Sequence, residues 1–119
     1  MKSNSRTTRI SDEIKREVSS LIQFEIKDPR ISSVMISVIR VETAMDLKLC
    51  KIYVSVFGDD AKKKDVLEGL KSATGFIRKE LARSIDLRNT PELQFFLDET
   101  AEYAMKMDAL ISEVNKSNN

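Results

Sequence analysis

The sequence predicts one α+β domain over residues 1–119, with helices packed against a small sheet in two layers. Three observations predict this fold class. Apolar residues recur at helical spacing in three stretches, two further stretches are rich in Val, Ile, Tyr and Phe, and a short apolar run follows a proline near residue 91. A chain of 119 residues, 41% of them apolar, can bury a single core but not two. The expected order is α-β-β-α-β-α.

The first helix is expected over residues 9–26. Its apolar positions recur every three or four residues: Ile10, Ile14, Val18, Leu21, Ile22 and Ile26. Asp28-Pro29 ends it, because a residue before proline is pushed out of the helical region. We interpret Asp28-Pro29-Arg30 as a helix stop in which Arg30 pairs locally, and the alternative is a functional role for this segment.

Two strands follow, over residues 33–42 and 47–57. The short link between them, Thr43 to Asp46, predicts a hairpin, although it lacks a preferred Asn-Gly or Asp-Gly pair. In the second strand Cys50 falls on the apolar side of the alternation. Cys50 is therefore expected to be a small core residue rather than a nucleophile.

The second helix is expected over residues 61–86, with a bend near its middle. Its apolar positions are Val66, Leu70, Ala73, Ile77, Leu81 and Ile85. A straight helix of this length would span about 39 Å, whereas a domain of this size is only about 35 Å across. Gly75 interrupts the stretch and is the position where a bend forms most easily.

The domain core is expected over about residues 6–98 and closes with a short strand at residues 93–97. A last helix is expected over about residues 99–114, because its apolar residues also follow helical spacing: Tyr103, Met107, Leu110, Ile111 and Val114. The polar tail, residues 115–119, is expected to fray.

The composition argues against an enzyme. The chain has no histidine, one cysteine and three glycines, so it lacks the commonest general base and metal ligand and cannot build a glycine-rich phosphate loop. We therefore expect no catalytic residues, no metal, no cofactor and no small-molecule substrate. No apolar run approaches a membrane span, no secretory signal is visible, and a single cysteine fits a reducing cytoplasm. We expect a cytoplasmic monomer with no membrane partner.

Charge is distributed unevenly along the chain. Residues 1–91 hold 18 Lys and Arg against 13 Asp and Glu, a net charge of +5, whereas residues 92–119 hold 2 against 6, a net charge of −4. A basic body with an acidic end indicates a polyanionic partner. Solvated helix faces with uneven charge are the alternative.

Cations surround Gly75 on one face of the second helix. On a helical wheel with Lys71 at zero, Gly75 falls at about 40°, Arg78 at about −20°, Lys79 at about 80° and Arg83 at about 120°, away from the apolar stripe. An exposed backbone without a side chain suits close approach of a phosphodiester chain. Further arginines are expected to extend this surface: Arg6, Arg9 and Arg88.

A helix, a break with glycine and a second helix, placed after an α-β-β unit and before a third strand, resemble the type II KH domain. That module normally carries Gly-x-x-Gly at the break, where it clamps a short single-stranded nucleic acid. This chain has Ser72-Ala73-Thr74-Gly75, so the first glycine is missing. The variant Ala73-Thr74-Gly75 resembles the bacterial ribosome-binding factor A family. Further segments match in order: Arg6-Thr7-Thr8-Arg9-Ile10, Asp28-Pro29-Arg30, Asp46-Leu47, Tyr53-Val54-Ser55-Val56, Leu87-Arg88 and Pro91-Glu92-Leu93-Gln94-Phe95.

The resemblance implies a KH-like domain with an additional C-terminal helix that acts as a non-enzymatic ribosome assembly factor. Such factors bind the small (30S) ribosomal subunit, contact 16S rRNA, assist late maturation and 5′-end processing of that RNA, and are often needed most in the cold. Ala73, Thr74 and Gly75 would form the kink motif. Two alternatives stay open: a KH-like scaffold that recruits a protein through its acidic end, and a generic binder of single-stranded RNA or DNA.

Overall fold

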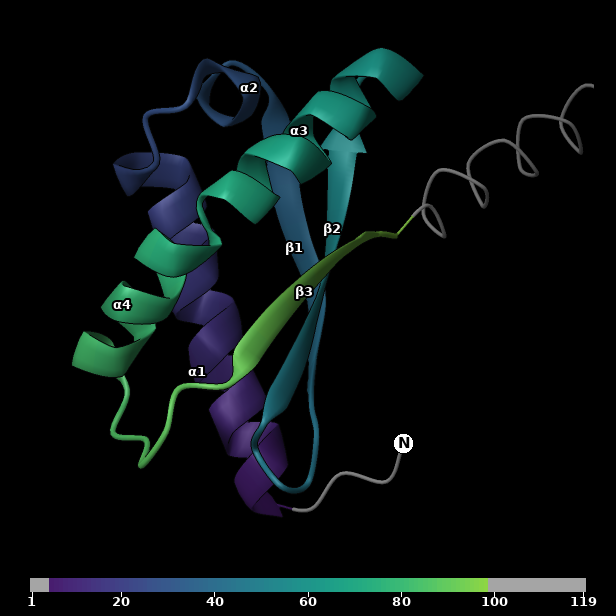
Figure 1. Cartoon of the computed structure of the whole chain (residues 1–119). Coiled ribbons are helices and arrows are strands. Elements are labelled where there is room, and N and C mark those ends of the chain that lie inside the picture. The colour runs from purple at the N-terminus through teal and green to yellow at the C-terminus, as the bar shows by residue number, and fades with distance from the viewer. Residues whose placement is uncertain (1–4, 99–119) are drawn as a thin grey trace, which may run out of the picture.

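The computed structural model describes residues 5–98 (Figure 1). Its elements in chain order are α1 (Ser5–Ser20), the π-helical turn η1 (Leu21–Glu25), α2 (Pro29–Ser32), β1 (Met35–Thr43), β2 (Leu49–Phe57), α3 (Asp60–Ser72), α4 (Thr74–Ser84) and β3 (Glu92–Leu97). The expected α+β class and the KH-like succession of α-β-β-α-break-α-β are confirmed. The helix expected over 99–114 and the tail at 115–119 lie outside the described residues.

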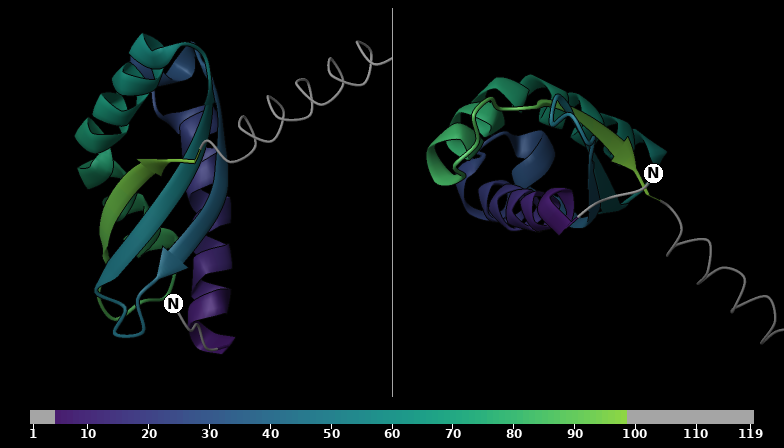
Figure 2. Two further views of the ribbon diagram at one scale, coloured as in Figure 1. Left: turned by 90° about the vertical axis from the view of Figure 1, so that its right-hand side faces the viewer. Right: turned by 90° about the horizontal axis from the view of Figure 1, so that it is seen from below.

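The three strands form one sheet in the order β1-β2-β3. β1 pairs with β2 antiparallel, as a hairpin requires, and β3 joins the other side of β2 in parallel. The helices lie on one face of this sheet, so the other face is open in the described part of the chain (Figure 2). β3 is therefore an edge strand next to α3, which contacts it directly.

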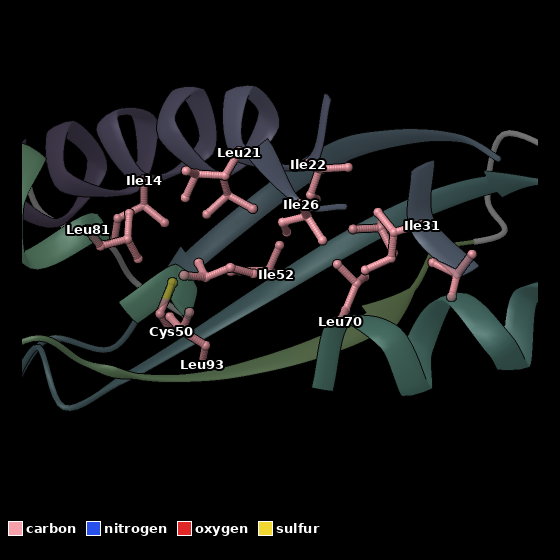
Figure 3. Packing of buried hydrophobic residues seen from close by; sticks show 14 of the residues in the cluster. Ile14, Leu21, Ile22, Ile26, Ile31, Cys50, Ile52, Leu70, Leu81 and Leu93 are labelled. Carbon is pink, nitrogen blue, oxygen red and sulfur yellow. The ribbon is translucent and has the colours of Figure 1, made fainter. Parts of the chain in front are cut away.

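The core fills the space between the sheet and the helices (Figure 3). Every apolar position expected in the first helix is buried, and the stripe of the second helix is buried except at Ala73, which packs against the core from its edge. β2 supplies its even-numbered residues, among them Cys50 and Ile52. Burial of this apolar surface is the main term that holds the layers together.

The first helix differs from expectation at both ends. It begins at Ser5 rather than residue 9, and its regular part ends at Ser20. The chain then widens into η1, where the N–H of Ile26 donates to the carbonyl of Leu21 at 2.9 Å, five residues back. Hydrophobic spacing alone does not distinguish this wider turn from a regular one, because Leu21 and Ile26 are buried in both.

Asp28 starts a short second helix, α2, that the sequence did not predict, whereas the first helix has already ended at Glu25 with Ile26 as its C-cap. Its carboxylate accepts a hydrogen bond from the backbone N–H of Arg30 at 3.0 Å, as an N-cap does, and Pro29 occupies the first helical position. The guanidinium of Arg30 also pairs with this carboxylate at 2.6 Å. The arginine holds the pKa of Asp28 below its usual value. The local pairing of Arg30 is therefore confirmed, whereas the helix ends three residues before the stop expected at Asp28-Pro29.

A bulge in β1 controls which residues meet across the hairpin. The pairing shifts between Val38 and Arg40, so that Ile39 has no partner on β2 and Arg40 lies opposite Tyr53. Tyr53 in turn lies opposite Phe96 of β3. These three side chains form a row across the open face of the sheet, with the Arg40 guanidinium 4.0 Å from the Tyr53 ring centre.

The β1–β2 link is longer than expected, since β2 begins at Leu49 rather than 47. Leu47 has a positive φ of 60°, which is uncommon for a residue other than glycine. Three hydrogen bonds hold the turn. The N–H of Ala44 donates to the carbonyl of Leu49 at 2.9 Å, the N–H of Leu47 donates to the carbonyl of Ala44 at 2.9 Å, and the N–H of Lys48 donates to Asp46 Oδ1 at 3.0 Å.

Candidate nucleic-acid interface

The expected break in the second helix is present, and it falls at Ala73. α3 ends at Ser72 and α4 begins at Thr74, with Ala73 between them at φ −86° and ψ −1°. The hydroxyl of Thr74 donates to the carbonyl of Leu70 at 3.0 Å, which satisfies one acceptor at the end of α3. The chain turns here without a glycine. The break falls at the first residue of the expected kink motif, Ala73-Thr74-Gly75, but two residues before Gly75, the expected hinge.

Gly75 lies in the first turn of α4 and is exposed. None of the described glycines has a positive φ, and a Cβ added at Gly75 would meet nothing within 4 Å. Neither backbone conformation nor packing against the described residues therefore requires a glycine at this position. The wheel placed Gly75 outside the core, which the structure confirms.

The four cations expected around Gly75 fall into two groups. Lys71, Lys79 and Arg83 are exposed, and Arg83 only approaches Glu80 at 3.5 Å. Arg78 is half-buried and donates from Nε and Nη2 to the carbonyl oxygens of Pro91 and Thr90, each at 3.0 Å. This guanidinium fixes the loop before β3, a structural role that the wheel could not reveal because its partners are twelve or more residues away.

Arg6 and Arg88 come together with Lys48, although they lie far apart in the sequence. The three cations line a depression of about 480 Å³ whose single acidic lining residue is Asp46. The start of α1, the β1–β2 link and the loop before β3 meet here. Lys48 was not predicted as a site residue, because nothing in its local sequence distinguishes it from other surface lysines.

Arg9 lies in a different electrostatic setting. With Arg6 and Arg16 it lines a hollow of about 570 Å³ between α1 and the end of α4. Three carboxylates share this hollow: Glu13, Glu17 and Asp86. The balance of charge makes the Arg9 side less attractive to an anion than the depression around Arg88.

A groove of about 450 Å³ runs between the helix break and β3. Lys71 and Thr74 line it from the helices, and Gln94 and Phe96 line it from the edge strand. The apolar residues Leu67, Leu93 and Phe95 complete the lining. Sequence reasoning missed Gln94 and Phe96, although the alternation in the segment Leu93 to Leu97 marks them as facing away from the core.

No catalytic arrangement stands out in this part of the molecule. Cys50 is fully buried, its thiol lies 3.8 Å from the Thr43 hydroxyl, and burial raises its pKa to about 11. Such a thiol is a core residue, as expected. Within residues 5–98, no three His, Cys, Asp or Glu side chains gather as a metal site would need. Over the same range, no helix is long and apolar enough to cross a lipid bilayer.

Comparison with known proteins points to one family. The family model described as Ribosome-binding factor A matches residues 6–111. The chain is 52% identical over 120 residues to Ribosome-binding factor A of Lachnospira eligens, covering 100% of this chain and 92% of that protein.

Solved structures of the same family share the fold. The crystal structure of ribosome-binding factor A from Thermus thermophilus is 25% identical and superposes with a TM-score of 0.67, covering 76% of this chain and 94% of that one. A homology model of the Thermus thermophilus factor, fitted into a cryo-electron microscopy map of a 30S complex, is 26% identical with a TM-score of 0.61 and covers 74% and 90% of the two chains. On the family model and this sequence identity, the chain belongs to the ribosome-binding factor A family.

Proposed function

We propose that this chain is an assembly factor that binds the small (30S) ribosomal subunit in the cytoplasm, contacts 16S rRNA and assists its late maturation and 5′-end processing without catalysing a reaction itself. The observation that carries the proposal is membership of a family in which a Thermus thermophilus member has been fitted into a 30S complex. The exposed cations among the described residues support a direct contact between this chain and the RNA of the subunit.

Two groups of exposed cations form the proposed RNA-binding surface. The first lies around the helix break and consists of Lys71, Lys79 and Arg83, next to the open backbone of Gly75. The second consists of Arg6, Lys48 and Arg88. Exposed lysine and arginine side chains bind phosphates by releasing condensed counterions, and this requires no deep pocket.

Arg9 and Arg78 are less available for RNA binding than the cations of these two groups. Carboxylates accompany Arg9 in its hollow, and two main-chain carbonyls already engage Arg78. Both stay predicted contacts, but substitution of Arg78 would disturb the loop before β3 as well as any RNA contact.

Co-sedimentation with small subunits in a sucrose gradient tests the proposal. The variant Lys71→Glu with Lys79→Glu reverses two exposed charges beside the break and should leave the protein at the top of the gradient. The matched control reverses two exposed lysines elsewhere, Lys27→Glu with Lys62→Glu, and should still co-sediment. Equal release of both variants would argue against the break as the interface, and failure of the unaltered protein to co-sediment would overturn the function itself.

A further inference from the structure

The groove beside the helix break runs along the free edge of the sheet. Within the described residues, β3 pairs only with β2 and lies next to α3 (Figure 1). Leu93 and Phe95 line the groove and also pack on the core, whereas Gln94 and Phe96 line it from the opposite face of the strand. Residues of both faces line one groove together only at the edge of a strand, so the groove lies beside the unpaired main chain of β3.

This edge is apolar, and its charge is positive. Leu67 of α3 adds an apolar side chain to the lining, and Phe96 is 37% exposed. Lys71 is the only charged side chain among the described residues that line the groove. A free strand edge is a template for pairing with another chain, and proteins commonly protect such an edge by covering it with a helix or a loop. The edge of β3 is therefore a surface that calls for a cover.

The chain itself supplies a candidate cover directly after β3. The N–H of Asp98 donates to the carbonyl of Val54 at 2.8 Å, so the strand is held to β2 up to its end and the following segment starts at the rim of the groove. The apolar positions of that segment, from Tyr103 to Val114, follow helical spacing. A segment tethered so close reaches the groove at a high effective concentration, about millimolar for a short link.

Length and charge both suit this occupant. The apolar stripe from Tyr103 to Val114 spans about 17 Å as a helix, and the six residues of β3 span about 17 Å as a strand. Residues 98–102 are available to reverse the chain, and links of about 2–6 residues between a strand and a helix are common. Residues 99–119 hold four Asp and Glu against two Lys, so an acidic segment would meet a groove whose lining is basic.

The open face of the sheet suits the segment less well. Its most exposed apolar residues are Met35 and Phe57, which are register partners. β3 runs parallel to β2 and ends opposite Val54, and β2 ends three residues later at Phe57. A helix that continued in the direction of β3 would pass these two residues in its first turns and then extend beyond the sheet.

We propose that the segment 99–114 reverses after Asp98 and lies as a helix antiparallel to β3, with its apolar stripe in the groove against Leu67 and Phe96. The docked helix covers the free edge of β3 and brings acidic residues to Lys71. Lys79 and Arg83 do not line the groove, so docking leaves them uncovered. The inference therefore goes beyond the proposed function and does not depend on it.

A tryptophan in the stripe tests the docking in the full chain. The chain contains no tryptophan, so Leu110→Trp introduces a single indole near the middle of the stripe, and Tyr103→Trp introduces one in place of another ring. Each indole should be several-fold less accessible to acrylamide than that of the matched control Ser112→Trp, which helical spacing places on the opposite side of the helix. Equal quenching of the three variants would overturn the docking.

Substitutions in the groove show where the stripe lies. Phe96→Asp places a carboxylate among apolar side chains and Lys71→Glu reverses the charge of the lining, so each should expose the Leu110→Trp indole to acrylamide. The matched controls are Phe57→Asp, at a residue that is 81% exposed on the open face, and Lys79→Glu, outside the groove. Both should leave the quenching unchanged. Lys71→Glu keeps the test decisive if Phe96→Asp does not fold.

The same measurements identify any other arrangement. Exposure of the indole by Phe57→Asp but not by Phe96→Asp would place the segment on the open face and overturn the proposal. Shielding that survives both groove substitutions would overturn it as well. Shielding that disappears on dilution would show that the segment of a second copy provides the cover, which also contradicts docking within one chain. None of these results bears on the proposed function, which co-sedimentation with small subunits measures separately.

Discussion

Arg78 in α4 donates from Nε to the carbonyl oxygen of Pro91 at 3.0 Å, directly before β3 begins. A second bond from its Nη2 reaches the carbonyl of Thr90 at the same distance. One guanidinium therefore holds the loop that leads from the end of α4 to the edge strand β3. Because Pro91 is buried and Leu93 follows in the core, this contact also sets where β3 enters the sheet.

Replacement of Arg78 should therefore affect stability before it affects RNA binding. Arg78→Met keeps part of the apolar stem but removes both charged hydrogen bonds, and should lower the free energy of unfolding by about 1–3 kcal/mol. The matched control Arg83→Met removes an exposed arginine whose ion pair is long, at 3.5 Å, and should change stability by less than about 0.5 kcal/mol. Urea denaturation measures both, and equal stability of the two variants would contradict the structural role.

Alanine substitutions at two glycines of the broken helix should act in opposite directions. At Gly75 an added Cβ meets nothing, so Gly75→Ala should raise the free energy of unfolding by up to about 1 kcal/mol through helix propensity. At Gly69 the new Cβ would lie 3.0 Å from Cγ1 of the buried Ile31, so Gly69→Ala should lower it by about 1–3 kcal/mol.

The same Gly75→Ala variant tests the RNA contact. If a phosphodiester chain approaches the backbone at Gly75, the variant should be more stable and yet co-sediment less well with small subunits. A stabilised variant that binds small subunits as strongly as before would remove Gly75 from the interface.

The hydrophobic pattern predicted the elements well because burial follows local spacing. Val66, Leu70, Ile77 and Leu81 are buried as expected, on both sides of the break. The break itself was correctly predicted from helix length, but it lies at Ala73 rather than at the predicted Gly75. Gly75 has the more permissive backbone, whereas the structure turns at Ala73 with ordinary dihedral angles and a capping contribution from Thr74.

Sequence reasoning could predict only those residues of the candidate site that lie together on one face of a single helical segment. Lys71 and Lys79 lie on one segment, so a wheel can place them. Lys48 lines the depression around Arg88, and Phe96 lines the groove beside the helix break, because the fold brings distant parts of the chain together. Arg78 is engaged by the carbonyl of Pro91, which is also distant in the sequence, and is therefore less available to RNA than the wheel indicated. Local spacing contains no information on such contacts.

The buried thiol of Cys50 should make the protein less stable at high pH. Burial raises its pKa from 9.0 to about 11, so the folded state holds the proton more tightly than the unfolded state. The stability linked to this group is fully present below pH 9 and is lost as the pH rises to about 11, a loss of about 2–3 kcal/mol. Urea titrations between pH 8 and 11 measure it, and Cys50→Ala should show a shallower decline. An equal decline in both proteins would contradict the assignment.

The cations around the Arg88 depression should each contribute to the salt dependence of RNA binding. If each of Arg6, Lys48 and Arg88 contacts a phosphate, single substitutions to Gln should reduce the slope of log K against log salt by about 0.7–0.9. The matched control Arg16→Gln removes a cation from the neighbouring hollow, where three carboxylates already balance the charge, and should leave the slope nearly unchanged. Filter binding of 16S rRNA between 50 and 300 mM salt, roughly the range over which counterion release dominates, measures the slope. A slope that falls for Arg16→Gln as much as for Arg88→Gln would show that general charge, rather than this depression, attracts the RNA.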